Sequence, residues 1–252
     1  MRIATWNVNS LRVRLPHLLD WLRDAKPDVA CLQETKTEDA NFPVAELRAA
    51  GYESAFFGQK SYNGVAILSR TPIADVGHGI PDFADDPKRC IHATINGIRV
   101  ICLYAPNGEA PGTDKYAYKL RWYSELARWI GQLKTANLAV LGDMNVAPED
   151  RDVHNPKRWE GKIHVSEPER AALRTVLDQG LLDAYRLFPQ PEKSFTWWDY
   201  RLKAFERGWG LRIDLAMLTP ALAKRCTGCT IDLAPRKRER PSDHTPVVVE
   251  LS

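Results

Sequence analysis

The most informative stretch of this 252-residue chain is Leu138-Ala-Val-Leu-Gly-Asp-Met-Asn145. Its first four residues are all apolar, which is typical of a short strand that is buried on both faces. Polar residues follow directly, because Asp143 and Asn145 come after the turn-forming Gly142. In layered α/β folds, ligand sites gather where buried strands end and loops begin. The stretch therefore predicts an inner strand that ends in a functional site.

Strand-like and helix-like segments alternate on both sides of this stretch. Strands are expected at 2–8, 28–33, 52–57, 64–69, 91–95, 99–104, 138–141, 194–198, 212–218, 229–233 and 246–251, and helices at 11–25, 44–50, 114–134 and 167–179. Asn96-Gly97 is the strongest short signal for a hairpin. The helix at 167–179 has Ser166 as its expected N-cap. The alternation predicts an α/β architecture, either two packed sheets with outer helices or a single doubly wound sheet.

The composition is that of a globular protein, with 44% hydrophobic and 27% charged residues. No apolar run approaches the ~20 residues of a membrane span, and the N-terminal sequence has no apolar signal region. The five cysteines cannot all pair. These features predict a reduced, cytoplasmic protein without a membrane partner. A net charge of +3 does not identify nucleic acid as a ligand, and the basic stretch from Lys224 to Arg240 is interpreted as a solvated face, with polyanion binding as the alternative.

Further polar residues stand at the ends of other expected strands. They are Asn7, Asn9, Glu34, Asn107, Asp214, Asp243 and His244. If these ends converge with Asp143, several carboxylates share one cleft and repel each other unless a cation neutralises them. The oxygen-rich set suits Mg²⁺ or Mn²⁺ better than Zn²⁺, and Mg²⁺ completes its shell with water and phosphate oxygens. A metal ion, an aspartate that activates water and a histidine near the phosphate together indicate a phosphate-ester hydrolase.

In their order along the chain, these motifs resemble the exonuclease III family of DNA-repair nucleases, within the endonuclease/exonuclease/phosphatase superfamily. The resemblance covers essentially the whole chain and runs through Leu32-Gln-Glu-Thr-Lys36, Tyr104-Ala-Pro-Asn-Gly108, Gly142-Asp-Met-Asn-Val146, Phe195-Thr-Trp-Trp-Asp-Tyr-Arg201, Gly210-Leu-Arg-Ile-Asp214 and Arg240-Pro-Ser-Asp-His244. It implies a four-layer α/β sandwich, with two mixed β-sheets packed face to face and helices outside. It also implies a single catalytic domain over residues 1–252.

The resemblance implies a role for each matching residue. The implied catalytic residues are Asn7, Tyr104, Asp143, Asn145, Asp214 and His244, and the implied metal-side residues are Glu34, Asn9 and Asp243. Asp143 resembles the residue that activates the attacking water or, alternatively, serves the leaving oxygen. Asp214 is expected to hold His244 against the phosphate. Some relatives carry aspartate at the position of Asn9, so this chain has one charge fewer and a weaker metal affinity is expected.

A second group of matching residues is implied to bind the substrate. It consists of Asn107, Trp197, Leu211, Ile213, Arg201 and His164. Trp197, Leu211 and Ile213 would line a pocket for an extruded, base-free sugar, although such residues usually belong to a core. Asn107 would hold the neighbouring phosphate, and Arg201 would insert into the duplex. His164 would narrow the pocket and favour 3′-end trimming over internal abasic cleavage; a surface-loop histidine is the alternative.

The implied function is that of a Mg²⁺-dependent nuclease that works as a monomer on double-stranded DNA with abasic sites, nicks or damaged 3′ ends. Its activities would be those of a 3′–5′ exonuclease, a 3′-end-cleaning phosphodiesterase, an abasic-site endonuclease or a mixture of these. Water would attack the phosphodiester and leave a 3′-hydroxyl. Two alternatives remain, a hydrolase of other phosphate esters and a catalytically silent RNA- or DNA-binding regulator on the same fold.

Overall fold

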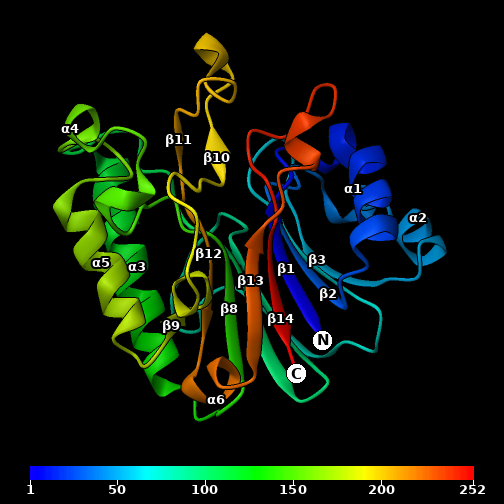
Figure 1. The fold of residues 1–252 in the computed structure, drawn as a ribbon. Coiled ribbons are helices and arrows are strands. Elements are labelled where there is room, and N and C mark those ends of the chain that lie inside the picture. The colour runs from blue at the N-terminus through cyan, green and yellow to red at the C-terminus, as the bar shows by residue number, and fades with distance from the viewer.

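Two six-stranded mixed sheets form the centre of the computed structural model, which describes residues 1–252 (Figure 1). The first sheet has the order β13 (Cys226–Ile231), β14 (Val247–Leu251), β1 (Arg2–Asn7), β2 (Val29–Gln33), β4 (Val65–Ser69), β3 (Glu53–Phe57). The second has the order β5 (Ala74–His78), β6 (Cys90–Ile95), β7 (Ile98–Tyr104), β8 (Leu138–Asp143), β12 (Asp214–Leu218), β9 (Leu182–Asp183). A separate ribbon of β10 (Trp197–Trp198) and β11 (Gly210–Leu211) projects beyond them.

The inner strands are apolar throughout because both of their faces are covered. In β8, Ala139 and Leu141 belong to the core between the two sheets, whereas Leu138 and Val140 belong to the core between the second sheet and its helices. All four side chains are at most 2% exposed. Successive residues of a strand point to opposite faces, so one short apolar run contributes to two cores. Truncating such a buried leucine to alanine typically costs about 2–5 kcal/mol of stability.

Helices cover the outer face of each sheet. On the first sheet lie α1 (Leu11–Ala25) and α2 (Val44–Ala49), and on the second lie α3 (Asp114–Gln132) and α5 (Glu167–Leu177) (Figure 1). Two helices of one turn, α4 (Pro156–Trp159) and α6 (Pro220–Ala223), lie in connecting segments. The order of layers is therefore helix, sheet, sheet, helix. This confirms the four-layer sandwich and excludes a single doubly wound sheet. None of the helices has both the length and the apolar character needed to cross a bilayer.

Most expected elements are present, with ends shifted by a few residues. The Asn96-Gly97 turn has φ of 50° and 74°, as a two-residue hairpin loop requires, and Ser166 caps α5 in a reciprocal pair with Glu169. Strand β5 was not expected, because it is an edge strand whose side chains are largely exposed and show no alternation. The expected strand at 194–198 is shortened to the two residues of β10.

The strand registers bring the polar strand ends together. Strands β1 and β2 run parallel and place Asn7 beside Gln33, and β7 and β8 run parallel and place Tyr104 beside Asp143. The antiparallel strand β12 enters at the same level and pairs Asp214 with Asp143. Because the two sheets face each other, both sets of ends open on one edge of the sandwich. That edge lies below the projecting β10–β11 ribbon (Figure 1).

Candidate active site

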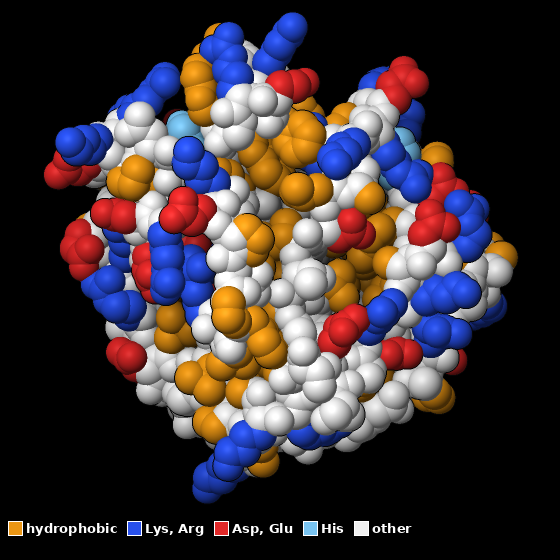
Figure 2. All heavy atoms as spheres, viewed as in Figure 1, with side chains coloured by type: hydrophobic (Ala, Val, Ile, Leu, Met, Phe, Trp, Pro, Cys, Tyr) orange, Lys and Arg blue, Asp and Glu red, His pale blue; other side chains and the backbone are white.

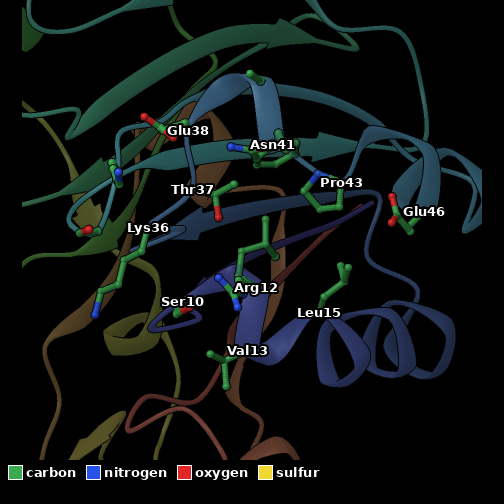
Figure 3. Close-up of a pocket in the computed structure, with 15 residues that line it drawn as sticks. Ser10, Arg12, Val13, Leu15, Lys36, Thr37, Glu38, Asn41, Pro43 and Glu46 are labelled. Atoms are coloured by element: carbon green, nitrogen blue, oxygen red, sulfur yellow. The ribbon is translucent and has the colours of Figure 1, made fainter.

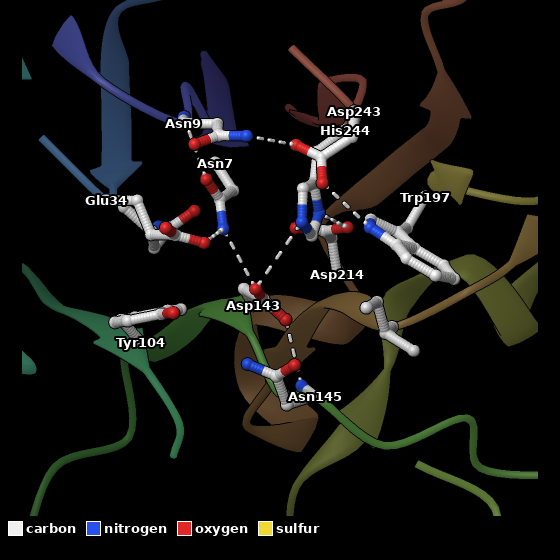
Figure 4. A network of polar contacts seen from close by, with 12 residues as sticks. Asn7, Asn9, Glu34, Tyr104, Asp143, Asn145, Trp197, Asp214, Asp243 and His244 are labelled. Carbon is white, nitrogen blue, oxygen red and sulfur yellow. Dashed lines mark hydrogen bonds and ion pairs between the residues drawn. The ribbon is translucent and has the colours of Figure 1, made fainter. Parts of the chain in front are cut away.

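Asp143 is at the centre of the polar network drawn in Figure 4. Its Oδ1 accepts a hydrogen bond from the backbone N–H of Asn145 at 2.9 Å, and its Oδ2 accepts one from Asn7 Nδ2 at 2.9 Å. The preceding Gly142 has φ of 155°, and a Cβ there would lie 1.9 Å from Leu103 O. Only glycine lets β8 approach β7 so closely. Both oxygens of the carboxylate thus accept a hydrogen bond, and Asp143 is 1% exposed.

Burial raises the pKa of Asp143 to about 7, and the charges of Asp214 and Glu34 add to this although His244 opposes it. A carboxylate with a pKa near neutrality is suited to accept a proton at neutral pH. Beside burial, the charges of Asp214 and Glu34 thus disfavour the ionised form of Asp143, as expected for carboxylates that share a cleft.

His244 and Asp214 form a buried pair beside Asp143. The imidazole Nδ1 lies 2.8 Å from Asp214 Oδ2, and Nε2 lies 3.7 Å from Asp143 Oδ2. Burial alone would lower the pKa of His244, but the charges of Asp214 and Asp143 and the hydrogen bond that His244 donates to Asp214 outweigh it and raise the pKa to about 10. At neutral pH the ring therefore carries both protons. Its Nε2–H faces the same space as Asp143, where it can donate to a phosphate oxygen.

Glu34 stands on the opposite side of the cleft, on the loop after β2. Its Oε1 accepts from Asn7 Nδ2 at 2.8 Å, so this one amide joins Glu34 to Asp143. Its Oε2 lies 2.9 Å from Lys36 Nζ, which also donates to Asn9 Oδ1 at 2.6 Å. The sequence analysis gave Lys36 no role. Its position two residues after the ligand candidate Glu34 was the available signal.

Asn9 and Asp243, the other two residues that the family resemblance implied on the metal side, lie next to each other. Asn9 Nδ2 donates to Asp243 Oδ1 at 2.8 Å, and the indole Nε1 of Trp197 donates to Asp243 Oδ2 at 3.0 Å. Both oxygens of Asp243 are thus engaged with protein donors. The hydrogen bond from Trp197 links the carboxylate cleft to the residues expected to form the sugar pocket.

Three ionisable side chains meet at the centre of the cleft, and atoms of Glu34, Asp143 and His244 lie within 4.8 Å of one another. The two carboxylates suit a hard ion such as Mg²⁺ or Mn²⁺. The doubly protonated imidazole of His244 has no free lone pair for a metal and faces the same space as a hydrogen-bond donor. A positive charge there would also relieve the repulsion that raises the pKa of Asp143. Of the residues predicted on the metal side, Glu34 belongs to this group, whereas Asn9 and Asp243 do not.

Tyr104 borders the cleft at the end of β7. Its pKa lies well above its usual value, because the phenol is buried and stands near the charges of Glu34 and Asp143. The guanidinium of Arg89 lies 4.9 Å from the ring centroid. The phenol thus keeps its proton at neutral pH and can act as a hydrogen-bond donor. Asn107, at the end of the same segment, is exposed and lies 3.5 Å from both Asn145 Oδ1 and His164 Nε2.

The residues expected to form the sugar pocket are neighbours in the structure. Leu211 and Ile213 belong to one small apolar cluster, against which Trp197 and Trp159 pack. The imidazole of His164 lies 6.2 Å from the Trp197 ring, centroid to centroid. His164 is only 6% exposed, so the surface-loop alternative is wrong. Arg201 is different, because it is exposed on the projecting ribbon and its one ion pair is with Asp199 at 3.6 Å.

A buried ion pair that the sequence analysis missed holds the site loops together. The ammonium of Lys119 on α3 pairs with Glu169 on α5, and both side chains are completely buried. Lys119 Nζ also donates to the carbonyl oxygens of Asn107, at 3.0 Å, and Asn145, at 2.7 Å. Glu169 accepts from the backbone N–H of His164 at 3.0 Å. Each of the three tethered residues is a predicted site residue.

A wide groove of about 1120 Å³ adjoins the cleft at Lys36 (Figure 3). It runs between the start of α1 and the loop that follows β2, and its lining includes Arg12 and Lys60 as well as Glu38 and Glu46. The carboxylate cleft is more deeply buried, since Asn7, Asp143 and His244 are at most 3% exposed. The carboxylate cleft therefore lies at the end of the groove and not at its centre.

The cleft of this four-layer sandwich combines converging carboxylates that can bind a metal ion with an imidazolium that is held by an aspartate. This combination defines a hydrolase of phosphodiesters. The sequence profile of the Endonuclease/Exonuclease/phosphatase family matches residues 4–244, and the chain belongs to this family. The exodeoxyribonuclease III of Haemophilus influenzae is 36% identical over 267 residues, with 100% of both chains covered. The resemblance to the exonuclease III family and the class of enzyme are thereby confirmed.

Two solved structures extend this comparison. The 3′ phosphatase NExo from Neisseria, bound to a product DNA hairpin, is 43% identical, with a TM-score of 0.98 over 100% of this chain and 99% of that chain. An AP endonuclease from Archaeoglobus fulgidus is 42% identical, with a TM-score of 0.97 over 100% of this chain and 99% of that chain. Two proteins with differently described activities are thus about equally similar to this chain.

Proposed function

We propose that this chain is a Mg²⁺-dependent DNA-repair nuclease that hydrolyses phosphodiesters in double-stranded DNA and leaves a 3′-hydroxyl. The observation that carries the proposal is the geometry of Asp143, His244 and Glu34, whose ligand atoms lie within 4.8 Å of one another. The nuclease names of the relatives support DNA as the substrate. Mn²⁺ is expected to substitute for Mg²⁺, because both prefer oxygen ligands.

Each side chain of the cleft has a separate role in hydrolysis. Asp143 Oδ2 takes a proton from the attacking water, while Asn7 and the N–H of Asn145 keep the carboxylate oriented. His244 donates Nε2–H to a phosphate oxygen, and Asp214 keeps the ring charged. Tyr104 provides a further protonated donor. A divalent cation bound beside Glu34, with Asn9 and Asp243 on the same side, would add positive charge at the phosphate.

We infer that His164 sets the preference among substrates. It is buried between Trp197 and the backbone of Asn145, whose carbonyl oxygen accepts from Nδ1 at 2.7 Å. In that place it narrows the space that Trp197, Leu211 and Ile213 leave for a base-free sugar. The chain should therefore favour the trimming and cleaning of 3′ ends over incision at internal abasic sites.

The remaining contacts are proposed on the same basis. Asn107 holds the phosphate next to the scissile one, because it is exposed beside Asn145. Arg201 inserts into the duplex from the projecting ribbon. The natural partners are duplexes with abasic sites, nicks or damaged 3′ ends, and the enzyme works as a monomer. Residues 1–252 act as one catalytic domain, since the site takes residues from Asn7 to His244.

The experiment is a cleavage assay on an end-labelled duplex with one internal abasic analogue and one recessed 3′ end, with Mg²⁺ or with EDTA. We expect Mg²⁺-dependent trimming of the 3′ end, weak abasic incision, and a loss of about 10²–10⁴-fold in rate for Asp143→Asn. His164→Gly should raise abasic incision relative to trimming, and an unchanged ratio rejects the role of His164. Absence of all cleavage with retained binding would support the silent regulator instead.

A further inference from the structure

A separate cavity of about 260 Å³ lies between α4 and the projecting β10–β11 ribbon. Three tryptophans line it, Trp159, Trp197 and Trp209, together with the basic side chains of Arg158, Lys162 and Arg201. Apart from Trp197, none of these residues contacts the carboxylate cleft. The proposed mechanism leaves this cavity without a function.

The aromatic side chains of the cavity are within reach of a ligand. All three tryptophans are partly exposed, although five other tryptophans of the chain are buried. Trp159 and Trp197 meet edge to face, with centroids 6.5 Å apart at 85°. On the other wall, the imidazole of His154 lies nearly parallel to Trp209, at 20° and 6.2 Å, and the guanidinium of the exposed Arg207 lies 4.6 Å from the Trp209 centroid. Such aromatic faces stack on nucleobases with little dependence on sequence.

The charge of its lining and its volume indicate which class of ligand the cavity binds. The basic residues Arg158, Lys162 and Arg201 are all exposed at the cavity, and Asp199 is the one acidic residue in its lining. This balance favours an anionic ligand. The volume lies below the roughly 300–1,000 Å³ of pockets that enclose drug-sized ligands. A single ring system with a phosphate outside the cavity fits both conditions.

Trp197 is the wall between this cavity and the proposed sugar pocket. One edge of its indole is tied to Asp243 by the 3.0 Å hydrogen bond, and its ring is a neighbour of His164. At the proposed sugar pocket, Leu211, Ile213 and His164 are each at most 6% exposed, so they offer little surface to a base. The aromatic cavity on the other side of Trp197 is open.

We propose that this cavity binds the unpaired nucleobase of a 3′-terminal nucleotide and thereby favours frayed or mispaired 3′ ends. The inference rests on the proposed nuclease function of the neighbouring cleft. In this arrangement the base stacks on Trp159, or on Trp209 in place of the exposed Arg207 guanidinium, and Arg158 and Lys162 face the flanking phosphates. Paired ends must first fray and base-free ends have nothing to stack, so only unpaired ends gain from the cavity.

The test uses duplexes that differ only at the 3′-terminal nucleotide, which is either mispaired 2-aminopurine or a base-free sugar. Without Mg²⁺, we expect binding to quench the 2-aminopurine fluorescence, and Trp209→Ala or Trp159→Ala to remove most of the quenching. With Mg²⁺, the same variants should raise KM for the mispaired end about tenfold, as loss of one stacking partner implies. For Trp209→Ala, which does not touch the sugar-pocket cluster, the kcat for that end and the cleavage of the base-free end should not change.

Two matched variants separate stacking from a general loss of structure. Trp209→Phe keeps an aromatic face and should restore quenching and KM, whereas Val76→Ala truncates an exposed apolar residue on β5, outside the cavity lining, and should change nothing. Equal losses on mispaired and base-free ends would overturn the proposal, as would unchanged quenching in both alanine variants. If the wild-type chain cleaves neither end, the nuclease function fails, and the quenching measured without Mg²⁺ still decides the fate of the cavity.

Discussion

At the scale of single residues, Lys36 places a positive charge where a metal ion is expected to bind. Its ammonium lies 2.9 Å from Glu34 Oε2 and also donates to Asn9 Oδ1. Asn9 is a neutral amide and not a second carboxylate. A cation that binds Glu34 must therefore compete with this ammonium. We expect Lys36→Met to tighten Mn²⁺ binding about tenfold, or about 1.4 kcal/mol, in a calorimetric titration. Lys36→Arg retains the charge and should bind like the wild type; weaker binding by Lys36→Met would show that the ammonium does not oppose the metal.

His164 gives a pH dependence whose sign can be worked out from its surroundings. Burial and the charge of Lys119 lower its pKa from 6.5 to about 3. Between these values the unfolded chain binds a proton that the folded chain does not, so the free energy of unfolding falls as the pH is lowered. His164→Asn keeps a residue that tolerates the local φ of 71°. Urea denaturation should show a slope that is shallower by up to about 1.4 kcal/mol per pH unit between about pH 4 and pH 6. An unchanged slope would mean that His164 is protonated in the folded state.

Residues differ in how far the sequence could predict them. Asp143, Asp214 and His244 were predictable, because polar residues that interrupt or end apolar strands are costly unless they have a role. Lys119 and Glu169 were not, because charged residues are usually exposed and nothing local marks them as buried. In the basic stretch before His244, Arg236 is 8% exposed and its guanidinium lies 4.8 Å from the Phe205 ring. That arginine is structural, so neither a solvated face nor polyanion binding describes it.

At the scale of elements, the Lys119–Glu169 pair fixes α3 to α5 and both to the loops of the site. Removing one partner leaves the other charge buried and unpaired, so Lys119→Met should cost about 3–5 kcal/mol of stability. The double variant Lys119→Met/Glu169→Gln should recover part of this loss, because neither residue is then charged. Denaturant titrations of the two single variants and the double variant measure the coupling. A double-variant cost equal to the sum of the single costs would show that the two residues act independently.

Elements with a strong local signal were predicted well, and those fixed by tertiary context were not. The hairpin at Asn96-Gly97 and the cap at Ser166 follow from backbone conformations that few residues adopt. The long helix α3 follows from its apolar stripe. Strand β10 has only two residues, because β11 is the only strand with which it pairs and the chain turns into a short 3-10 segment, Arg201–Lys203, soon after Trp198. Its length depends on packing that no local pattern encodes.

At the scale of the whole molecule, apolar strands alone could not distinguish two facing sheets from one doubly wound sheet. In both architectures an inner strand such as β2 is buried on both faces, and its sequence reads the same. The distinction came from the resemblance to a family and is confirmed by the strand order. The convergence of the site residues was likewise implied by the resemblance to a family and not by apolar strands alone. Asn7 and Asp143 are bonded across the two sheets, although 136 positions separate them in the chain.

The molecule carries little net charge, so DNA binding must depend on where the charges lie. Lys and Arg side chains stand on the projecting ribbon and on the segment opposite, with an apolar hollow between them (Figure 2). Each phosphate that a basic residue neutralises releases counterions, and the logarithm of the binding constant falls against the logarithm of salt with a slope of about −0.9 per contact.

If Arg201 contacts the backbone or inserts beside it, Arg201→Ala should make the slope shallower by about 0.9. The measurement is fluorescence anisotropy of a labelled duplex in EDTA across a salt series. Lys134, exposed just after α3, is the matched control, because its side chain lies away from the ribbon and Lys134→Ala should leave the slope unchanged. An equal slope for Arg201→Ala and the wild type would place Arg201 outside the DNA interface and leave duplex binding to the groove beside Lys36.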